Sequence, residues 1–391
     1  MGIFCGSKSQ KGPYLGVMAG IYIHYPFCKQ ACHYCNFHFS TQLKQQDKML
    51  KSMLAELELQ SSFLKKPLES IYFGGGSPSL LSPKVIEQWL LKIDQLFEIQ
   101  TPIEISLEVN PDDASPTYLK TLKQVGVNRI SLGIQSFQQK HLDVMNRLHN
   151  AAQAELALEH TAALFDNFSI DLIYGMPQST LASWEEDIDR ALQYKPMHLS
   201  AYALTEEPKT VLAHQVKTGE VILLEEELVK AQFDHLVQRL TQQGYNHYEV
   251  SNFGKPNYYA VNNSNYWKGK AYLGIGPGAH SFDGINTRSW NVSNNPLYMK
   301  QIQEGLLPQE SETLSQKDLF NEYIMTGLRT QWGVSLHAIR TRFGPHFAAY
   351  LEEQVTPQLV LQNVFWDGDI LKISQHARFL SDGIASDLFL L

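Results

Sequence analysis

From residue 21 onward, short apolar segments alternate with longer stretches whose apolar residues recur at helical spacing. The apolar segments predict six strands, at residues 21–25, 70–73, 103–109, 129–134, 168–173 and 198–203. Successive strands begin about 30 residues apart, which is the spacing of βαβ units. Two of the connecting helices have start signals, Ser82-Pro83 and Ser115-Pro116, because serine caps a helix and proline fits its first position.

The later strands alternate apolar with small or polar residues. In the third strand, for example, Ile105 and Leu107 alternate with Ser106 and Glu108. A parallel sheet with helices on both faces would instead have continuous apolar runs. One apolar face and one polar face predict an α/β fold, a partial (β/α)6 barrel of the TIM type, with room for a polar ligand in its lumen. The alternative is an antiparallel sheet with one solvated face, which the helical spacers disfavour.

The remaining sequence is less regular. It predicts a helix near residues 225–243, a polar linker at 305–315, two helices near 316–330 and 336–343, and a hairpin formed by 359–364 and 370–373. This pattern favours a small α+β, winged-helix-like module at the C-terminus. The predicted division is a disordered tail (1–18), a partial-barrel core (19–240), an extension that closes the barrel (241–310) and the C-terminal domain (311–391).

Composition excludes several classes of protein. The 391 residues include 32 Lys and Arg against 40 Asp and Glu, for a net charge of −8. This balance argues against a protein that binds nucleic acid by neutralising phosphates. The chain contains no apolar run of about 18 residues, so no transmembrane segment is predicted. The first 20 residues lack the apolar region of a signal peptide, and Met18 is a second candidate start.

The four cysteines indicate a metal site. Cys28, Cys32 and Cys35 form a C-x3-C-x2-C motif directly after the first strand, while Cys5 lies near the N-terminus. Clustered cysteines are typical of metal ligands in a reducing compartment, which predicts a cytoplasmic location. Zinc is one alternative, with His38 as a fourth ligand. The other is a 4Fe-4S cluster held by three thiolates, which leaves one iron open for another ligand.

Further candidate residues follow the ends of other predicted strands. Gly74-Gly75-Gly76-Ser77 follows the second strand, Glu108 lies near the end of the third, and Gln135 follows the fourth. Arg147 and Asp171 come next along the chain. Each of these residues alone would more often be structural. Because active sites of barrels lie at the carboxyl ends of the strands, the set together predicts one functional face.

These motifs resemble the radical SAM superfamily. They are most similar to the branch that contains oxygen-independent coproporphyrinogen III dehydrogenase and heme chaperones of the HemW type, including its HemN-type C-terminal domain. The resemblance implies a 4Fe-4S cluster on Cys28, Cys32 and Cys35, S-adenosylmethionine (SAM) at the open iron, and an electron donor. It implies SAM contacts for Tyr22, Gly75 and Glu108. Six further residues match the dehydrogenase's positions for a second SAM: Tyr34, Gly76, Ser77, Gln135, Arg147 and Asp171.

Two departures from the dehydrogenase favour the chaperone type. Phe37 occupies the position of a further dehydrogenase cysteine, and only 20 residues precede the first strand. The resemblance therefore implies a protein that binds heme or a porphyrin and delivers heme to client proteins. The alternative is an oxidoreductase that acts on coproporphyrinogen III or a related substrate, so whether the protein is an enzyme stays open.

The heme-associated H-N-x-x-Y-W motif is altered, since Asn262 replaces its histidine. A carboxamide is a poor ligand for heme iron, whereas imidazole is a common axial ligand. His247 and His280 are the nearest replacements by motif. Heme is therefore held by another histidine, or heme binding is altered or lost.

Overall fold

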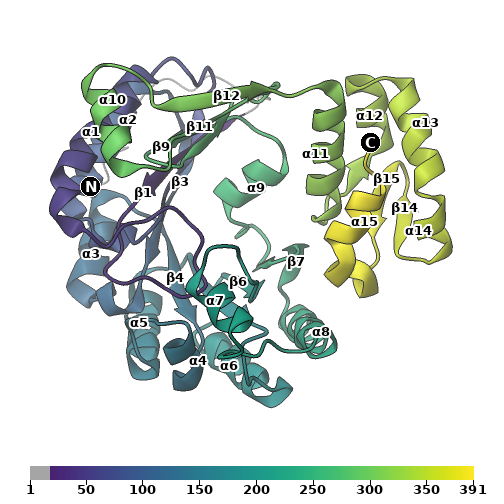
Figure 1. Ribbon diagram of the computed structural model, residues 1–391, viewed down its shortest axis with the longest axis horizontal. Helices are drawn as coiled ribbons and strands as arrows, with labels where there is room; N and C mark the ends of the chain where they lie inside the picture. Colours follow the sequence, from purple (N-terminus) through teal and green to yellow (C-terminus); the bar gives the residue numbers. More distant parts are fainter. Residues whose placement is uncertain (1–17) are drawn as a thin grey trace.

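The computed structural model describes residues 18–391 and is built around a twelve-stranded sheet (Figure 1). Six strands lie next to one another in chain order and are parallel. They are β1 (Ala19–Tyr25), β2 (Leu68–Gly75), β3 (Ile99–Val109), β4 (Arg129–Gln135), β5 (Phe168–Tyr174) and β6 (His198–Ala203). The predicted α/β class and all six strands are confirmed, although β3 begins at Ile99 rather than at Ile103.

Helices follow these strands and cover the outside of the sheet (Figure 1). They are α1 (Gln46–Leu59), α2 (Pro83–Leu96), α3 (Pro116–Val125), α4 (Gln139–Val144), α5 (Ala151–Leu164), α6 (Leu181–Gln193) and α8 (Glu226–Gln242), while α7 (Val211–Lys217) contacts the loop after β1. Both predicted start signals are confirmed, because Ser82 accepts a hydrogen bond from the Val85 amide and Ser115 accepts one from the Tyr118 amide. Gly126, with φ of 113°, ends α3 in the left-handed conformation that glycine allows.

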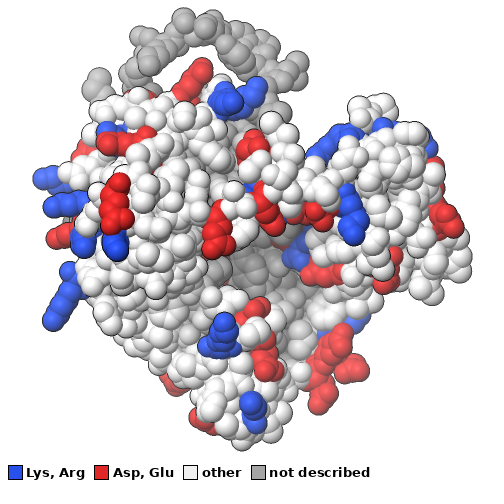
Figure 2. Space-filling model, turned by 45° about the horizontal axis from the view of Figure 1, so that its top comes forward, with Lys and Arg blue, Asp and Glu red and all other residues white. Residues whose placement is uncertain are grey.

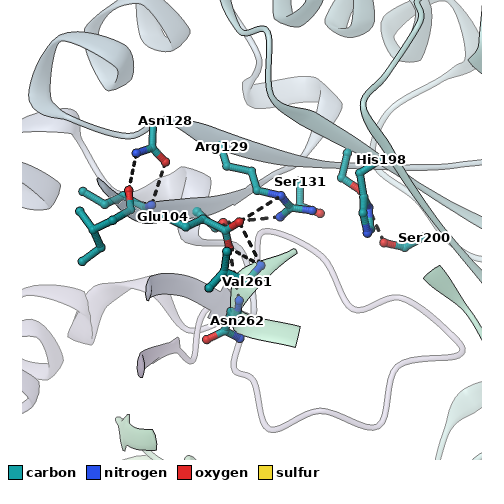
Figure 3. A network of polar contacts seen from close by, with 12 residues as sticks. Glu104, Asn128, Arg129, Ser131, His198, Ser200, Val261 and Asn262 are labelled. Carbon is teal, nitrogen blue, oxygen red and sulfur yellow. Dashed lines mark hydrogen bonds and ion pairs between the residues drawn. The ribbon is translucent and has the colours of Figure 1, made fainter. Parts of the chain in front are cut away.

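The alternation along the strands separates two environments. Apolar residues such as Ile105 and Leu107 pack in the core beneath the helices. Their polar neighbours turn inward, where Glu104, Arg129 and His198 are buried in the lumen (Figure 3). The polar lumen predicted from the alternation is therefore present, and it is lined by charged side chains as well as small ones.

Residues 246–313 extend the sheet at both edges. On the β6 side lie β8 (Asn252–Gly254) and then β7 (Asn246–Glu249), both antiparallel to their neighbours. On the β1 side lie β9 (Tyr272–Ile275), parallel to β1, and then β10 (His280–Phe282), β11 (Thr287–Asn291) and β12 (Gln309–Thr313). Helix α9 (Val261–Trp267) lies in the chain between these two groups of strands, and α10 (Asn295–Gln303) contacts α1.

The polar segment predicted as a linker contains strand β12. All five of its residues are exposed, yet their backbone pairs with β11 over its full length. Strand pairing uses backbone groups, so an edge strand can form where every side chain is polar. Glu310 and Glu312 place charges on this edge, which discourages pairing with another chain.

The C-terminal residues form a second apolar core with its own three-stranded antiparallel sheet. Its elements are α11 (Gln316–Leu328), β13 (Val334–Ser335), α12 (Leu336–Arg342), α13 (Pro345–Gln354), α14 (Thr356–Val360), β14 (Val364–Asp367), β15 (Ile370–Ile373) and α15 (Ser381–Asp387). The hairpin turns at Gly368-Asp369, one residue beyond the predicted Asp367-Gly368. Its first strand was predicted to begin at Leu359, which is wrong, because Thr356-Pro357 starts the short helix α14.

No helix within residues 18–391 is long and apolar enough to cross a membrane. Cys5 and all but the last residue of the predicted disordered tail (1–18) lie outside the described residues.

A buried carboxylate joins α1 to the extension. Glu56, fully buried on α1, accepts hydrogen bonds from the Gly276 amide (2.8 Å) and the Asn291 amide (2.6 Å), and also from the Tyr298 hydroxyl. Burial raises the pKa of Glu56 to about 7, although these hydrogen bonds act in the opposite direction. The contact fixes the loop after β9 against the helix that follows the cysteine motif.

This carboxylate predicts a specific dependence of stability on pH. The pKa of Glu56 is higher in the folded chain than in the unfolded chain, so the folded state retains a proton that the unfolded state has lost. The contribution of Glu56 to stability is therefore present below its unfolded pKa and is lost as pH rises toward about 7. We expect wild-type stability, measured relative to Glu56→Gln by urea unfolding, to fall by up to about 1.4 kcal/mol per pH unit over that window. A difference that is constant with pH would contradict this assignment.

Candidate functional site

A cavity of about 480 Å³ lies at the carboxyl ends of the parallel strands. Figure 2 shows the hollow on this side of the molecule, with acidic and basic side chains around it. Every predicted site residue except Tyr22 lines this cavity: Cys28, Cys32, Tyr34, Cys35, Gly75, Gly76, Ser77, Glu108, Gln135, Arg147 and Asp171. The structure therefore brings together residues that the sequence spreads over more than a third of the chain.

The three cysteines are half-buried free thiols on the loop that follows β1. Distant segments hold this loop, since the Cys28 amide donates to the Ser40 carbonyl (3.1 Å) and the His33 amide donates to the Met145 carbonyl (3.1 Å). The Leu212 amide in α7 donates to the His33 carbonyl (2.8 Å). Burial raises the pKa of Cys28 to about 11, and the neighbouring thiols add to the rise. A cationic metal centre would relieve this cost, because it binds thiolates.

The arrangement of the thiols suits a cluster better than a single zinc ion. Zinc needs four ligands that converge on one point. Within residues 18–391 no three His, Cys, Asp or Glu side chains are placed to hold one ion. The Nε2 atom of His38, the suggested fourth zinc ligand, instead lies 2.7 Å from Asn295 Oδ1. In a 4Fe-4S cluster each thiolate binds a different iron, so the three sulfurs need not converge.

Arg147 provides a positive charge beside the cysteines. Its Nη1 lies 3.4 Å from Cys32 Sγ, and its Nη2 donates to Asn110 Oδ1 and to the Gly133 carbonyl, both at 3.0 Å. Next to it Gln135 has a φ of 68°, in the left-handed region that side chains other than glycine rarely adopt. Strained residues of this kind cluster at ligand sites, which supports a binding role for this end of β4.

The glycine segment after β2 packs against the backbone that enters the cysteine loop. A Cβ atom on Gly76 would lie 2.6 Å from the Phe27 carbonyl oxygen and 2.8 Å from that of Tyr25. The Ser77 amide donates to the Phe27 carbonyl at 2.7 Å. Glycine at position 76 therefore allows the segment to lie directly against the protein's own backbone. Any side chain at position 76 would push the cysteine loop away from the strands.

Two carboxyl groups face the cavity from β3 and β5. Glu108 accepts a hydrogen bond from the Tyr72 hydroxyl (2.9 Å), and Asp171 accepts one from the Ser131 hydroxyl (3.0 Å). Burial raises the pKa of Glu108 to about 7 and also raises the pKa of Asp171. These groups can accept hydrogen bonds from ligand hydroxyl or ammonium groups, and a cationic ligand would favour their ionised forms.

Tyr22 lies beside the cavity without lining it. Its hydroxyl is 3.3 Å from His24 Nδ1, and its ring stacks on that of Tyr72 at 6.0 Å. Tyr72 itself lines the cavity, as do Asn110, Arg129, Ser131 and Tyr202, none of which was predicted. Tyr72, Ser131 and Tyr202 share the strand parity of the polar face, which was a usable signal. Nothing local distinguishes Asn110, which reaches the site through its contact with Arg147.

A second cavity, of about 620 Å³, adjoins the first, and Tyr202 and Asn263 line both. Aromatic and cationic side chains from α9, the extension and α11 line it, among them Tyr266, Trp267, Tyr272, Phe282, Arg288 and Arg329.

The candidate heme ligands at positions 262, 247 and 280 do not line this cavity. The Asn262 carboxamide is buried against Gly20 of β1. His247 stacks on Phe253 at 4.3 Å and its Nε2 lies 3.0 Å from the Val250 carbonyl oxygen.

Comparisons with known proteins agree with these features. The model of the Radical SAM superfamily matches residues 22–191, and the HemN C-terminal domain matches residues 314–380. The curated "Heme chaperone HemW" of Lactococcus lactis is 33% identical over 349 residues, covering 88% of this chain and 90% of the relative. The protein of the same name in Haemophilus influenzae is 36% identical over 371 residues, covering 93% and 96%.

One solved structure supports the fold. Coproporphyrinogen III oxidase (HemN) from Escherichia coli superposes with a TM-score of 0.82 at 22% identity, covering 96% of this chain and 91% of that chain. Membership of the superfamily implies a 4Fe-4S cluster and SAM, and the thiols, the glycine segment and the carboxyl groups of the first cavity fit both. On sequence similarity over nearly the whole chain, the protein belongs to the HemW family of radical SAM proteins.

Proposed function

We propose that this protein is a cytoplasmic heme chaperone, which binds heme and delivers it to heme-requiring client proteins. The observation that carries the proposal is the second cavity, because its volume of about 620 Å³ is within the range of pockets that enclose a ligand of this size. Aromatic side chains suit the faces of a flat macrocycle. Arginine and lysine side chains at the same cavity suit the two carboxylates of heme.

In this proposal the first cavity holds the cluster and SAM. Cys28, Cys32 and Cys35 hold the 4Fe-4S cluster, which supplies one-electron chemistry to SAM when an external donor has reduced it. Gly75 and Glu108 contact the SAM at the open iron, and Tyr22 acts indirectly, by packing behind Tyr72. The residues at the dehydrogenase's second SAM positions bind and orient a polar ligand in the lumen: Tyr34, Gly76, Ser77, Gln135, Arg147 and Asp171.

Phe37 bears on the alternative, an oxidoreductase that acts on coproporphyrinogen III. Its side chain is 65% exposed and lines the first cavity, at the position where the dehydrogenase has a further cysteine. Phenylalanine can neither bind metal nor transfer a proton. We therefore propose that the chain lacks the dehydrogenase activity.

Two assays on the anaerobically reconstituted protein test the proposal. Hemin titration followed by absorbance should give saturable binding of one heme per chain. Incubation with coproporphyrinogen III, SAM and a reductant should give no protoporphyrinogen. Catalytic formation of protoporphyrinogen would favour the oxidoreductase, and failure to bind hemin would refute the chaperone.

A further inference from the structure

The second cavity offers an unusual set of iron ligands. None of the described residues that line it is histidine or cysteine. The common heme ligands among the side chains there are tyrosines and the thioether of Met325. Ferric iron is a hard ion, so it favours the oxygen of a tyrosine over a thioether.

The four tyrosines that line the cavity differ in the hydrogen bonds of their hydroxyl groups and in the exposure of their side chains. The Tyr323 hydroxyl accepts a hydrogen bond from the Ser335 amide (3.1 Å), and the Arg342 guanidinium lies 5.2 Å from the centre of its ring. Tyr202 is 44% exposed and lies at the junction with the first cavity. Tyr266, also exposed, packs against Tyr272 with its ring tilted by 31°, at a centroid distance of 4.2 Å.

Tyr272 is the tyrosine best prepared to bind iron. It is 9% exposed on β9, where pairing with β1 fixes its backbone. The pKa of Tyr272 is raised: burial raises it most and the charge of Glu322 adds to the rise, while the charge of Arg288 and hydrogen bonds from Tyr266 and Arg288 act to lower it. Arg288 is itself held in place by Glu322, because its Nη1 donates to Glu322 Oε1 (2.8 Å) and its Nη2 donates to Glu322 Oε2 (3.0 Å). The Arg288 guanidinium offsets part of the cost that burial places on the phenolate form, and binding to ferric iron would favour that form further.

We propose that Tyr272 supplies the axial oxygen ligand to ferric heme in the second cavity, with Arg288 and Tyr266 as positioning residues. The inference rests on the proposed heme binding and goes beyond it by naming the ligand. When the oxygen binds iron, the O–H bond breaks, and its proton is released to solvent. Lys268 and Arg342 line the same cavity and form no ion pair within residues 18–391, so they are available to the heme carboxylates.

The test uses the full chain, loaded with hemin. Resonance Raman spectroscopy of the wild type should show iron–phenolate vibrations, and absorbance should show a high-spin ferric heme. Tyr272→Phe should abolish these vibrations and weaken hemin binding at least tenfold, while iron and sulfide content stay unchanged. Tyr323→Phe is the matched control. It also removes a hydroxyl group from this cavity, but that hydroxyl already accepts a hydrogen bond from the Ser335 amide. Its spectrum should match the wild type.

The outcomes separate this inference from the proposed function. If the wild type binds hemin without iron–phenolate vibrations, Tyr272 is not the ligand, whether or not the variant folds, and the chaperone proposal stands. The same conclusion follows if Tyr272→Phe leaves the spectrum unchanged. If the wild type binds no hemin, both proposals are wrong.

Discussion

Replacing Cys28, Cys32 and Cys35 together with alanine is expected to remove the cluster completely. Iron and acid-labile sulfide in the reconstituted protein should fall from about four of each per chain to background, since no other thiol in residues 18–391 can anchor the cluster. The absorbance of the cluster should disappear with them. Binding of SAM, measured by equilibrium dialysis, should fall in parallel, because its proposed attachment point is the open iron.

Cys5→Ser is the matched control for this experiment. It also removes a thiol, but one from the N-terminal segment outside the described residues, and we expect iron and sulfide content equal to wild type. Tightly bound zinc without labile sulfide in the wild type would contradict the cluster assignment. Loss of the cluster in Cys5→Ser would show that the three-cysteine motif is insufficient.

Removing the charge of Arg129 is expected to destabilise the barrel strongly. Arg129 is 2% exposed, and its Nε lies 3.9 Å from Glu104 Oε2 inside the lumen (Figure 3). The Glu104 carboxylate also accepts hydrogen bonds from the amides of Val261 (3.1 Å) and Asn262 (3.4 Å), which tie the start of α9 to β3. Arg129→Met leaves this carboxylate buried without its counter-charge. Breaking a buried pair in this way costs about 3–5 kcal/mol.

Urea unfolding of the full chain measures this loss. Arg190→Met is the matched control, because Arg190 forms partly exposed pairs with Glu155 and Glu186 and should cost less than about 1 kcal/mol. In the double variant Arg129→Met/Glu104→Gln the buried charge of Glu104 is removed as well, so part of the stability should return. A loss for Arg129→Met as small as that of the control would show that the pair contributes little to the fold.

Much of the fold followed from local pattern. The period of two along β3 to β6 predicted which residues face the helices, because successive side chains of a strand point to opposite faces. Ser82 and Ser115 marked helix starts through contacts within one turn of the chain. The pattern was wrong in two places. At Thr356-Pro357 a helix begins where a strand was predicted, because proline fits the first turn of a helix. In β12 the backbone pairs with β11 although every side chain is polar.

The candidate site divides in the same way. The spacing of Cys28, Cys32 and Cys35 predicted a metal loop without any tertiary information, since all three lie within eight residues. Matching motifs then identified residues at the ends of four strands, and the parallel order of those strands placed them around one cavity. Tyr22 is the exception, because its ring packs behind Tyr72 rather than into the cavity.

By itself, the sequence determined the six core strands, the polar lumen, the three-cysteine loop and the family. All of these depend on spacing along the chain or on motifs within it. Tertiary structure alone decided that Asn262 turns toward Gly20, that Glu104 holds α9, and that Tyr272 meets Arg288 beside the second cavity. Those features need side chains from segments far apart in the sequence to meet. Their contacts depend on how the elements pack together, so the local periodicity of the sequence does not predict them.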